Sequence, residues 1–154
     1  MSVDSFLDTN VLIYAVSSDP AEAPKKEKTL ELIENTDFGL SAQVLQEFYI
    51  TVTKKIALPL PPYDAVALLE QFRNLPVVWT DYPLIVAGIE TALRFEISYW
   101  DGAIIAAAER LGAATLYTED LNHGQRYGSV EAINPFLPGD ADSVHEEPEP
   151  PYGR

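Results

Sequence analysis

The chain alternates short apolar runs with longer stretches in which apolar side chains recur every three or four residues. Short continuous apolar runs are typical of buried strands, and the longer spacing is typical of helices with one buried face. The runs predict strands at residues 3–7, 38–40, 76–80, 114–117 and 130–133. The longer stretches predict helices at residues 11–16, 25–35, 42–55, 63–74, 82–95 and 98–111.

Capping residues and prolines mark several of these boundaries. Ser41 is a suitable N-cap for the third helix, and Lys54 and Lys55 complement the dipole at its C-terminal end. Three prolines between residues 58 and 62 break the chain before the fourth helix, and Gly112 ends the last one. Strands that alternate with helices predict an α/β fold with a mainly parallel sheet of about four to five short strands, covered by helices on both faces.

Length and composition indicate one folded domain followed by a tail. A chain of 154 residues with 47% hydrophobic residues can bury a single core without the help of disulfides. We expect this domain to span residues 1–137. Residues 138–154 are rich in proline and acidic residues and poor in large apolar ones, so we expect them to form a disordered acidic tail.

The charge balance and the absence of cysteine exclude several kinds of protein. The formal net charge is −14, which repels nucleic acid at long range and argues against a passive nucleic-acid-binding module. Because there is no cysteine, disulfides, thiolate zinc sites and cysteine nucleophiles are excluded. No segment has the pattern of a signal peptide or a membrane span. We therefore expect a soluble, cytoplasmic protein.

Four acidic residues lie where an α/β fold gathers its functional side chains. Asp8 and Asp120 follow predicted strands, and parallel sheets bind ligands outside the carboxyl ends of their strands. Asp101 opens a predicted helix, and Glu47 lies within the first two turns of another. Carboxylates that meet at one edge repel one another unless a cation joins them. All-oxygen ligands favour Mg²⁺ or Mn²⁺, which can activate a water for phosphodiester hydrolysis.

Each of these acids also has a simpler structural interpretation. The two acids that follow strands could belong to ordinary turns. Ser98 and Asp101 have the spacing of a capping box, in which the acid satisfies a backbone N–H at the start of a helix. Glu47 could be a solvated helix residue, although apolar neighbours place it near a buried face. We interpret His123 as structural and not as a metal ligand.

Around the four acids, the sequence shows a series of segments in a characteristic order. They are FLDTNVL at 6–12, SAQVLQEF at 41–48, SYWD at 98–101 with its alanine-rich continuation, and YTEDL at 117–121 followed by HG. This series resembles the PIN-domain ribonucleases, specifically the VapC-type toxins of toxin–antitoxin systems, and INPF at 133–136 fits as well. One such segment is weakly specific, whereas four in this order and spacing are strongly specific. The resemblance covers roughly residues 4–137.

The resemblance implies a three-layer α/β/α PIN-like fold and the activity of an endoribonuclease. The acidic positions that bind metal and catalyse correspond to Asp8, Glu47, Asp101 and Asp120. The polar positions that support them correspond to Asn10 and Thr118. The family further implies Mg²⁺ or Mn²⁺ as the cofactor, RNA as the substrate and a homodimer. It also implies an antitoxin protein that inserts a segment into the active-site groove.

Three other functions stay open at this point. A haloacid-dehalogenase-type phosphatase also starts from an aspartate after its first strand. It uses a second aspartate two residues later as a general acid, where this chain has Asn10. A catalytically inert binding module predicts that some of the acids are missing, yet all four are present. A housekeeping RNA-processing nuclease would share the chemistry and differ in its biological role.

Overall fold

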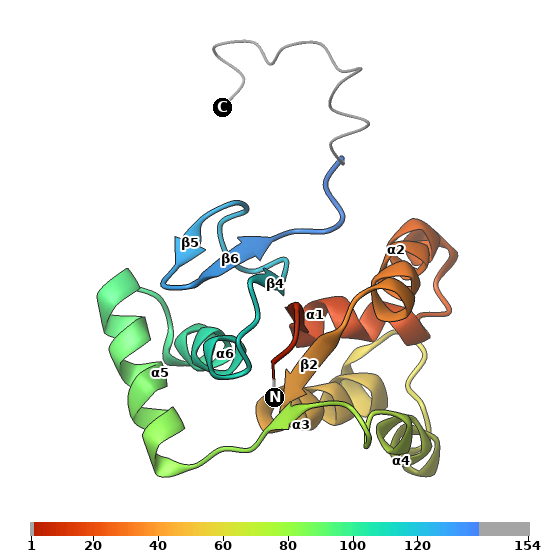
Figure 1. The fold of residues 1–154 in the computed structure, drawn as a ribbon. Helices are drawn as coiled ribbons and strands as arrows, with labels where there is room; N and C mark the ends of the chain where they lie inside the picture. Colours follow the sequence, from red (N-terminus) through yellow and green to blue (C-terminus); the bar gives the residue numbers. More distant parts are fainter. Residues whose placement is uncertain (1, 139–154) are drawn as a thin grey trace.

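The computed structural model describes residues 2–138, which form a six-stranded sheet between two groups of helices (Figure 1). The strands are β1 (Ser5–Leu7), β2 (Phe38–Ser41), β3 (Val77–Val78), β4 (Thr115–Tyr117), β5 (Arg126–Tyr127) and β6 (Val130–Ile133). Their order in the sheet is β3-β2-β1-β4-β6-β5. Neighbouring strands are parallel except for β5, which is antiparallel to β6. The predicted α/β class and mainly parallel sheet are confirmed.

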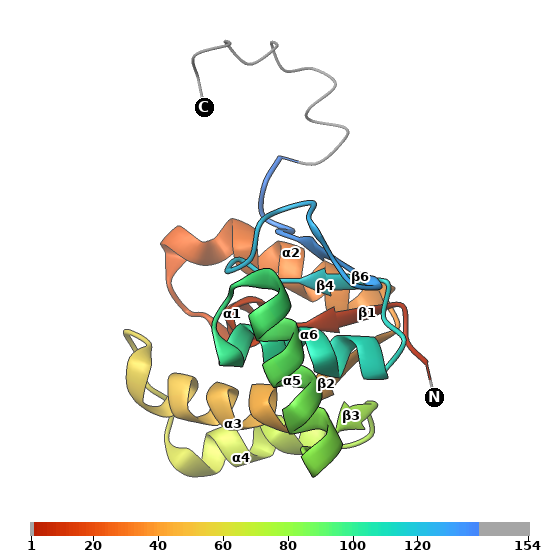
Figure 2. The same ribbon diagram turned by 90° about the vertical axis from the view of Figure 1, so that its left-hand side faces the viewer.

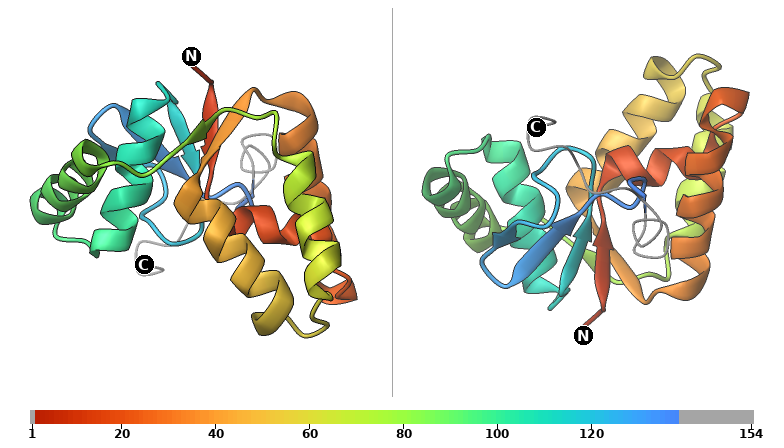
Figure 3. Two further views of the ribbon diagram at one scale, coloured as in Figure 1. Left: turned by 90° about the horizontal axis from the view of Figure 1, so that it is seen from below. Right: turned by 90° about the horizontal axis from the view of Figure 1, so that it is seen from above.

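The helices divide into two groups on opposite sides of the sheet. They are α1 (Thr9–Leu12), α2 (Ala23–Asn35), α3 (Ala42–Ile50), α4 (Pro62–Gln71), α5 (Tyr82–Phe95) and α6 (Tyr99–Arg110). Helices α5 and α6 lie on one side and α1 to α4 on the other, which gives the three layers (Figure 3). Helix α6 packs against β2, β4 and β6, and α5 lies outside it (Figure 2).

Strand β1 lies at the centre of the sheet and carries the first acid to its carboxyl end. Ser5 pairs with Phe38 of β2 on one side and with Thr115 of β4 on the other. Phe6 and Leu7 are completely buried, which explains the continuous apolar run, because a central parallel strand is covered on both faces. Asp8 therefore leaves the core at the middle of the sheet edge.

One strand was not predicted from the sequence. The pattern indicated four to five strands, and β5 is a sixth, formed by Arg126 and Tyr127 alone. Tyr127 is buried and Arg126 is exposed, but two residues are too few to show the alternation that identifies a strand. The strand exists because the turn before β6 folds these two residues back onto it as a hairpin.

Some predicted helix boundaries differ from those in the structure. The helix predicted at residues 11–16 begins at Thr9 and continues from Ile13 as a 3₁₀ helix, η1 (Ile13–Val16). The earlier start has a local cause, because the Asp8 carboxylate accepts a hydrogen bond from the Thr9 backbone N–H at 2.7 Å. The helix predicted at 63–74 begins at Pro62 and ends at Gln71.

The predicted caps are confirmed in the structure. The Ser41 hydroxyl accepts a hydrogen bond from the Val44 backbone N–H at 3.2 Å, which starts α3 directly after β2. Gly112 follows α6 with φ of +74°, a left-handed conformation that glycine adopts without strain. The end of α3 differs from the prediction, since its last turn is a π-helix, η3 (Thr51–Lys55).

Helices α5 and α6 approach closely at a pair of glycines. A Cβ atom at Gly102 would lie 2.5 Å from the Gly88 carbonyl oxygen and 2.9 Å from the Ala92 Cβ. Gly102 directly follows Asp101, so this contact also fixes the helix turn that carries the third acid.

We predict that Gly102→Ala destabilises the fold by about 1–3 kcal/mol, because the backbone carbonyl that the new methyl group meets has to move. Urea unfolding of the variant and the parent measures the difference. In a helix without this contact, the same substitution would stabilise by up to about 1 kcal/mol. The sign of the change in the free energy of unfolding therefore decides between the two cases. A gain in stability would show that α5 can move to admit the methyl group at little cost.

None of the helices in residues 2–138 has both the length and the hydropathy of a membrane span. The end of the domain expected at residue 137 stays a prediction. The disordered tail expected at 138–154 lies, apart from Pro138, outside the described residues.

Candidate active site

The four predicted acids come from separate elements whose ends face one edge of the sheet. Asp8 follows β1, and Glu47 lies on α3, which begins directly after β2. Asp101 lies in the first turn of α6, and Asp120 lies in the loop that follows β4. Because neighbouring parallel strands end at the same edge, this topology brings together residues more than a hundred positions apart in sequence.

Asp8 is the most buried of the four acids, with a relative exposure of 5%. One carboxylate oxygen accepts the Thr9 backbone N–H, and the other accepts the Thr118 hydroxyl at 2.8 Å. The pKa of Asp8 is raised to about 7, mainly by burial and in smaller part by the charges of Asp120 and Glu47, while the two hydrogen bonds lower it. A nearby cation would therefore stabilise the ionised form of this carboxylate.

Glu47 is half-buried and oriented by two polar neighbours. The Thr9 hydroxyl donates to one of its carboxylate oxygens at 2.8 Å, and the Gln43 side-chain amide donates to the other at 3.4 Å. Thr9 thus contacts both of the first two acids, through its backbone N–H to Asp8 and its hydroxyl to Glu47. The predicted placement of Glu47 near a buried face is confirmed.

Asp101 lies beside a helix cap but does not form the cap itself. The cap is the Ser98 hydroxyl, which accepts the backbone N–H of Asp101 at 3.1 Å. Among residues 2–138, the Asp101 carboxylate accepts no hydrogen bond from the Ser98 backbone N–H, so only one of the two hydrogen bonds of a capping box is present. Burial raises the pKa of Asp101, with further contributions from the charges of Asp120 and Glu47 and an opposing one from Ser98.

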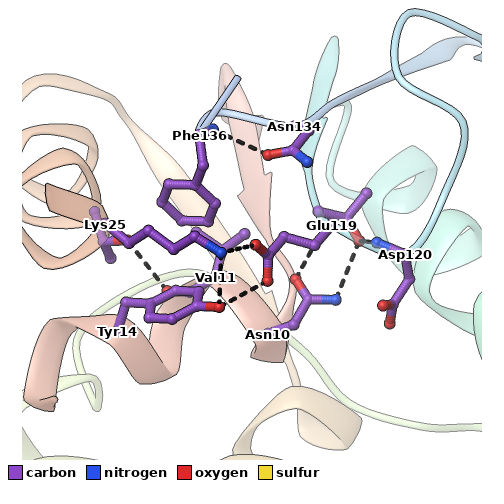
Figure 4. Close-up of polar contacts among 10 residues, drawn as sticks. Asn10, Val11, Tyr14, Lys25, Glu119, Asp120, Asn134 and Phe136 are labelled. Atoms are coloured by element: carbon purple, nitrogen blue, oxygen red, sulfur yellow. Dashed lines mark hydrogen bonds and ion pairs between the residues drawn. The ribbon is translucent and has the colours of Figure 1, made fainter. Parts of the chain in front are cut away.

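The predicted supporting residues, Asn10 and Thr118, link Asp8 to the loop of Asp120. The Thr118 hydroxyl donates to Asp8 and accepts the backbone N–H of Asp120 at 3.0 Å. The Asn10 amide nitrogen lies 3.4 Å from the same hydroxyl, and its amide oxygen accepts the backbone N–H of Glu119 at 3.1 Å (Figure 4). These contacts connect the ends of β1 and β4 at the level of the acids.

The four acids are close enough for their charges to affect one another. Asp120 and Glu47 act on Asp8, and the same two charges act on Asp101. A pocket of about 300 Å³ opens beside them and is lined by Asp8, Glu47 and Asp120 together with Lys55. Lys55 reaches this pocket from the π-helical turn η3, a rare conformation that often occurs at functional sites.

The cluster fits a hard divalent cation by the chemistry of its donors. Every candidate ligand is a carboxylate oxygen, the donor type that Mg²⁺ and Mn²⁺ prefer. In the described part of the chain, however, no group of three or more acidic or histidine side chains is arranged around a single point. Repulsion between like charges favours such separation in the absence of a cation. The residues thus offer the right donors without forming a closed ligand cage.

Two other predictions about this region can be compared with the structure. His123 has a structural contact, because its Nδ1 accepts the backbone N–H of Asn134 at 3.0 Å. Thr9 and Gln43 were not predicted as contacts of Glu47. Gln43 had a usable signal, since it precedes Glu47 by one helical turn and such pairs face each other.

The sequence profile of the PIN domain matches residues 5–128 of this chain, which is most of its length. The chain belongs to the PIN-domain family. This assignment confirms the resemblance and the three-layer fold expected from the motifs. It also removes the haloacid-dehalogenase alternative, in agreement with Asn10 in place of a second aspartate. A comparison with curated proteins gives no match.

Several solved structures share the PIN fold of this chain. FitAcB from Neisseria gonorrhoeae is 23% identical, with a TM-score of 0.58, over 86% of this chain and 99% of that one. VapC20 from Mycobacterium tuberculosis is described as a sarcin-ricin-loop-cleaving toxin. It is 17% identical, with a TM-score of 0.61, over 76% of this chain and 90% of that one. A chain of VapBC2 from Rickettsia felis, solved with a promoter DNA fragment, is 20% identical, with a TM-score of 0.58, over 83% of this chain and 96% of that one.

Proposed function

We propose that this PIN domain is a metal-dependent endoribonuclease that uses Asp8, Glu47, Asp101 and Asp120 to hold Mg²⁺ or Mn²⁺. The observation that carries the proposal is the pocket at the carboxyl ends of the strands that Asp8, Glu47 and Asp120 line together. Asp101 lies close enough to this pocket for the charges of Asp120 and Glu47 to raise its pKa. When bound, the cation supplies an activated water and neutralises charge at the phosphate that is cleaved.

The residues around the acids orient them for this role. Thr118 and the Thr9 backbone N–H fix both oxygens of Asp8, while the Thr9 hydroxyl fixes one oxygen of Glu47. Thr118 also holds the backbone N–H of Asp120. These hydrogen bonds restrict the orientations of the carboxylates, so fewer side-chain conformations have to be excluded when the cation and the substrate bind.

Two adjoining pockets beside the acids offer RNA a path. A second pocket, of about 560 Å³, shares Ile13, Thr51 and Lys55 with the pocket of the acids. We assign Lys55 to contact a phosphate of the RNA backbone, because an acidic protein needs a local cation to hold a polyanion. The shared lining places this lysine between the acids and the second pocket.

We further propose that the chain is the toxin of a toxin–antitoxin pair, with a protein antitoxin as its partner and a homodimer as its assembly. The support is the shared fold with FitAcB, VapC20 and VapBC2. The neighbouring reading frame tests this role. A small protein with a DNA-binding N-terminal part and an extended C-terminal segment supports it. Absence of such a gene, together with no effect on growth when the chain is expressed, would favour an RNA-processing role.

We predict that RNA cleavage by the purified chain stops in excess EDTA and returns when Mg²⁺ or Mn²⁺ is added in excess of the chelator. The reason is that the described cluster offers carboxylates as its only charged donors, and these need a hard cation to activate water. Cleavage of labelled RNA on a gel measures the effect, and melting of the protein in EDTA controls for unfolding. Full activity in EDTA would contradict the proposal.

A further inference from the structure

A fifth carboxylate, that of Glu119, lies next to the candidate ligand Asp120 in sequence but points away from it. Figure 4 shows the Glu119 side chain directed toward Lys25 and Tyr14, while the Asp120 carboxylate is directed to the opposite side. Glu119 accepts the Lys25 ammonium group at 2.7 Å and the Tyr14 hydroxyl at 2.9 Å. The two carboxylates of this loop thus belong to different environments.

Lys25 contacts groups from three separate parts of the chain. Besides Glu119, its ammonium group donates to the Tyr14 hydroxyl at 3.3 Å. It also lies 5.0 Å from the centre of the Tyr14 ring and 5.3 Å from that of Phe136. The two rings meet edge to face at 5.0 Å. Lys25 therefore connects α2, η1 and the segment after β6 to the loop that follows β4.

The loop is held at both the backbone and the side chain of Glu119. Its backbone N–H donates to Asn10, and its carboxylate is bound by Lys25 and Tyr14. The next residue is Asp120, whose backbone N–H is held by Thr118. The residues on either side of the peptide bond between 119 and 120 are therefore fixed, which limits the directions that the Asp120 carboxylate can take.

The ion pair itself contributes little to stability. The side chains of Lys25 and Glu119 are 41% and 23% exposed, and solvent screens the attraction in pairs of this kind. An unpaired lysine near the acids would also oppose the binding of a metal cation by repulsion. Its pairing with Glu119 partly offsets that repulsion. Because the pair adds little stability, its main effect is to order the loop that follows β4.

We propose that Lys25 is a positioning residue of the active site, acting through Glu119 to fix the loop that presents Asp120. The inference rests on the proposed function, because it assigns Asp120 to a metal cation. Residues that orient metal ligands from outside the ligand shell typically change metal affinity or activity by about 10–100-fold when replaced. We expect an effect of this size at Lys25.

The test compares Lys25→Met with Lys26→Met by titrating each protein with Mn²⁺ in a calorimeter. Lys26 is the next residue on α2, loses the same charge, and donates to the Ser17 carbonyl at 3.0 Å instead of to the loop. Loss of a positive charge by itself strengthens Mn²⁺ binding. Loss of positioning weakens it, so the two explanations predict opposite signs. We expect Lys25→Met to raise the Kd about tenfold and Lys26→Met to leave it unchanged or lower.

Two further variants separate positioning from a general structural role. Lys25→Arg keeps the charge and the hydrogen-bond donors, so it should restore most of the affinity. In Glu119→Gln, the contact that Lys25 acts through is already weakened, so adding Lys25→Met should produce little further loss. Additive losses in the double variant would contradict an action through Glu119.

Amide hydrogen exchange in metal-free protein tests the positioning without relying on the metal. We expect faster exchange at Glu119 and Asp120 in Lys25→Met and no change in Lys26→Met. Unchanged exchange, or equal Mn²⁺ affinity in the two variants, would overturn the inference. Failure of the wild-type protein to bind Mn²⁺ would instead overturn the proposed function, and the exchange result would still decide whether Lys25 orders the loop.

Discussion

Replacing Asp101 by asparagine is expected to reduce RNA cleavage by about 100-fold or more while the metal-free protein keeps or gains stability. Asparagine retains an oxygen but loses the charge that a divalent cation requires. Burial and the charge of Asp120 raise the pKa of Asp101 in the folded protein. Ionised Asp101 therefore lowers stability at neutral pH, and its removal should not lower the melting temperature in EDTA. Cleavage and melting are measured on the same preparation.

Ser98→Ala is the matched control for this prediction, because the structure gives the capping role to Ser98. Loss of the cap should destabilise the protein by about 1 kcal/mol, which lowers the melting temperature by about 2–4 °C in a chain of this size. Cleavage should stay close to that of the parent. An Asp101→Asn variant that is less stable but active would show that Asp101 serves the helix and not the metal.

Replacing Glu47 by glutamine is expected to abolish cleavage with almost no change in the fold. The amide oxygen can still accept the Thr9 hydroxyl, and the Gln43 side chain can turn its own amide to match the new partner. The free energy of unfolding should change by no more than about 0.5 kcal/mol, since no apolar contact is lost. Single-turnover cleavage and urea unfolding check the two halves of this prediction.

Glu90→Gln on the exposed side of α5 is the control for the charge change in Glu47→Gln. Both variants lose one negative charge from a helix, but Glu90 is an exposed residue of α5, which carries none of the four acids. We expect Glu90→Gln to cleave RNA at the parental rate. Equal losses in both variants would mean that overall charge governs activity. An unfolded Glu47→Gln protein would assign Glu47 a structural role.

Sequence patterns predicted the elements well where the local signal is strong. The boundaries of α5 agree with the prediction at both ends, because a continuous helical pattern begins next to Pro83 and ends at Phe95. Ser41 also predicted the start of α3 correctly. The two-residue strand β5 was missed, since it exists only through its pairing with β6. The π-helical turn η3 was missed too, because its residues also suit an ordinary α-helix.

The candidate site divides in the same way between local and distant signals. Asp8 and Asp120 could be placed from the strand ends before them, and the structure brings them to one edge of the sheet. The network of Lys25, Tyr14 and Glu119 could not be predicted, because Glu119 lies 94 positions after Lys25 and 105 positions after Tyr14 in the sequence. The local sequence of an amphipathic helix does not show whether one of its lysines binds a distant side chain or points into solvent. Only the tertiary structure reveals this contact.

The central position of β1 also determines when the site can assemble during synthesis. The hydrogen bond from Thr118 to Asp8 closes a loop of 110 residues, and β1 stays without its neighbour β4 until that part of the chain has been made. Pairings between such distant segments form slowly, whereas the local helices form early. A nascent chain that stops before β4 therefore contains Asp8, Glu47 and Asp101 but lacks both Asp120 and the Thr118 hydroxyl that orients Asp8. The complete set of acids can therefore assemble only when synthesis of the domain is almost finished.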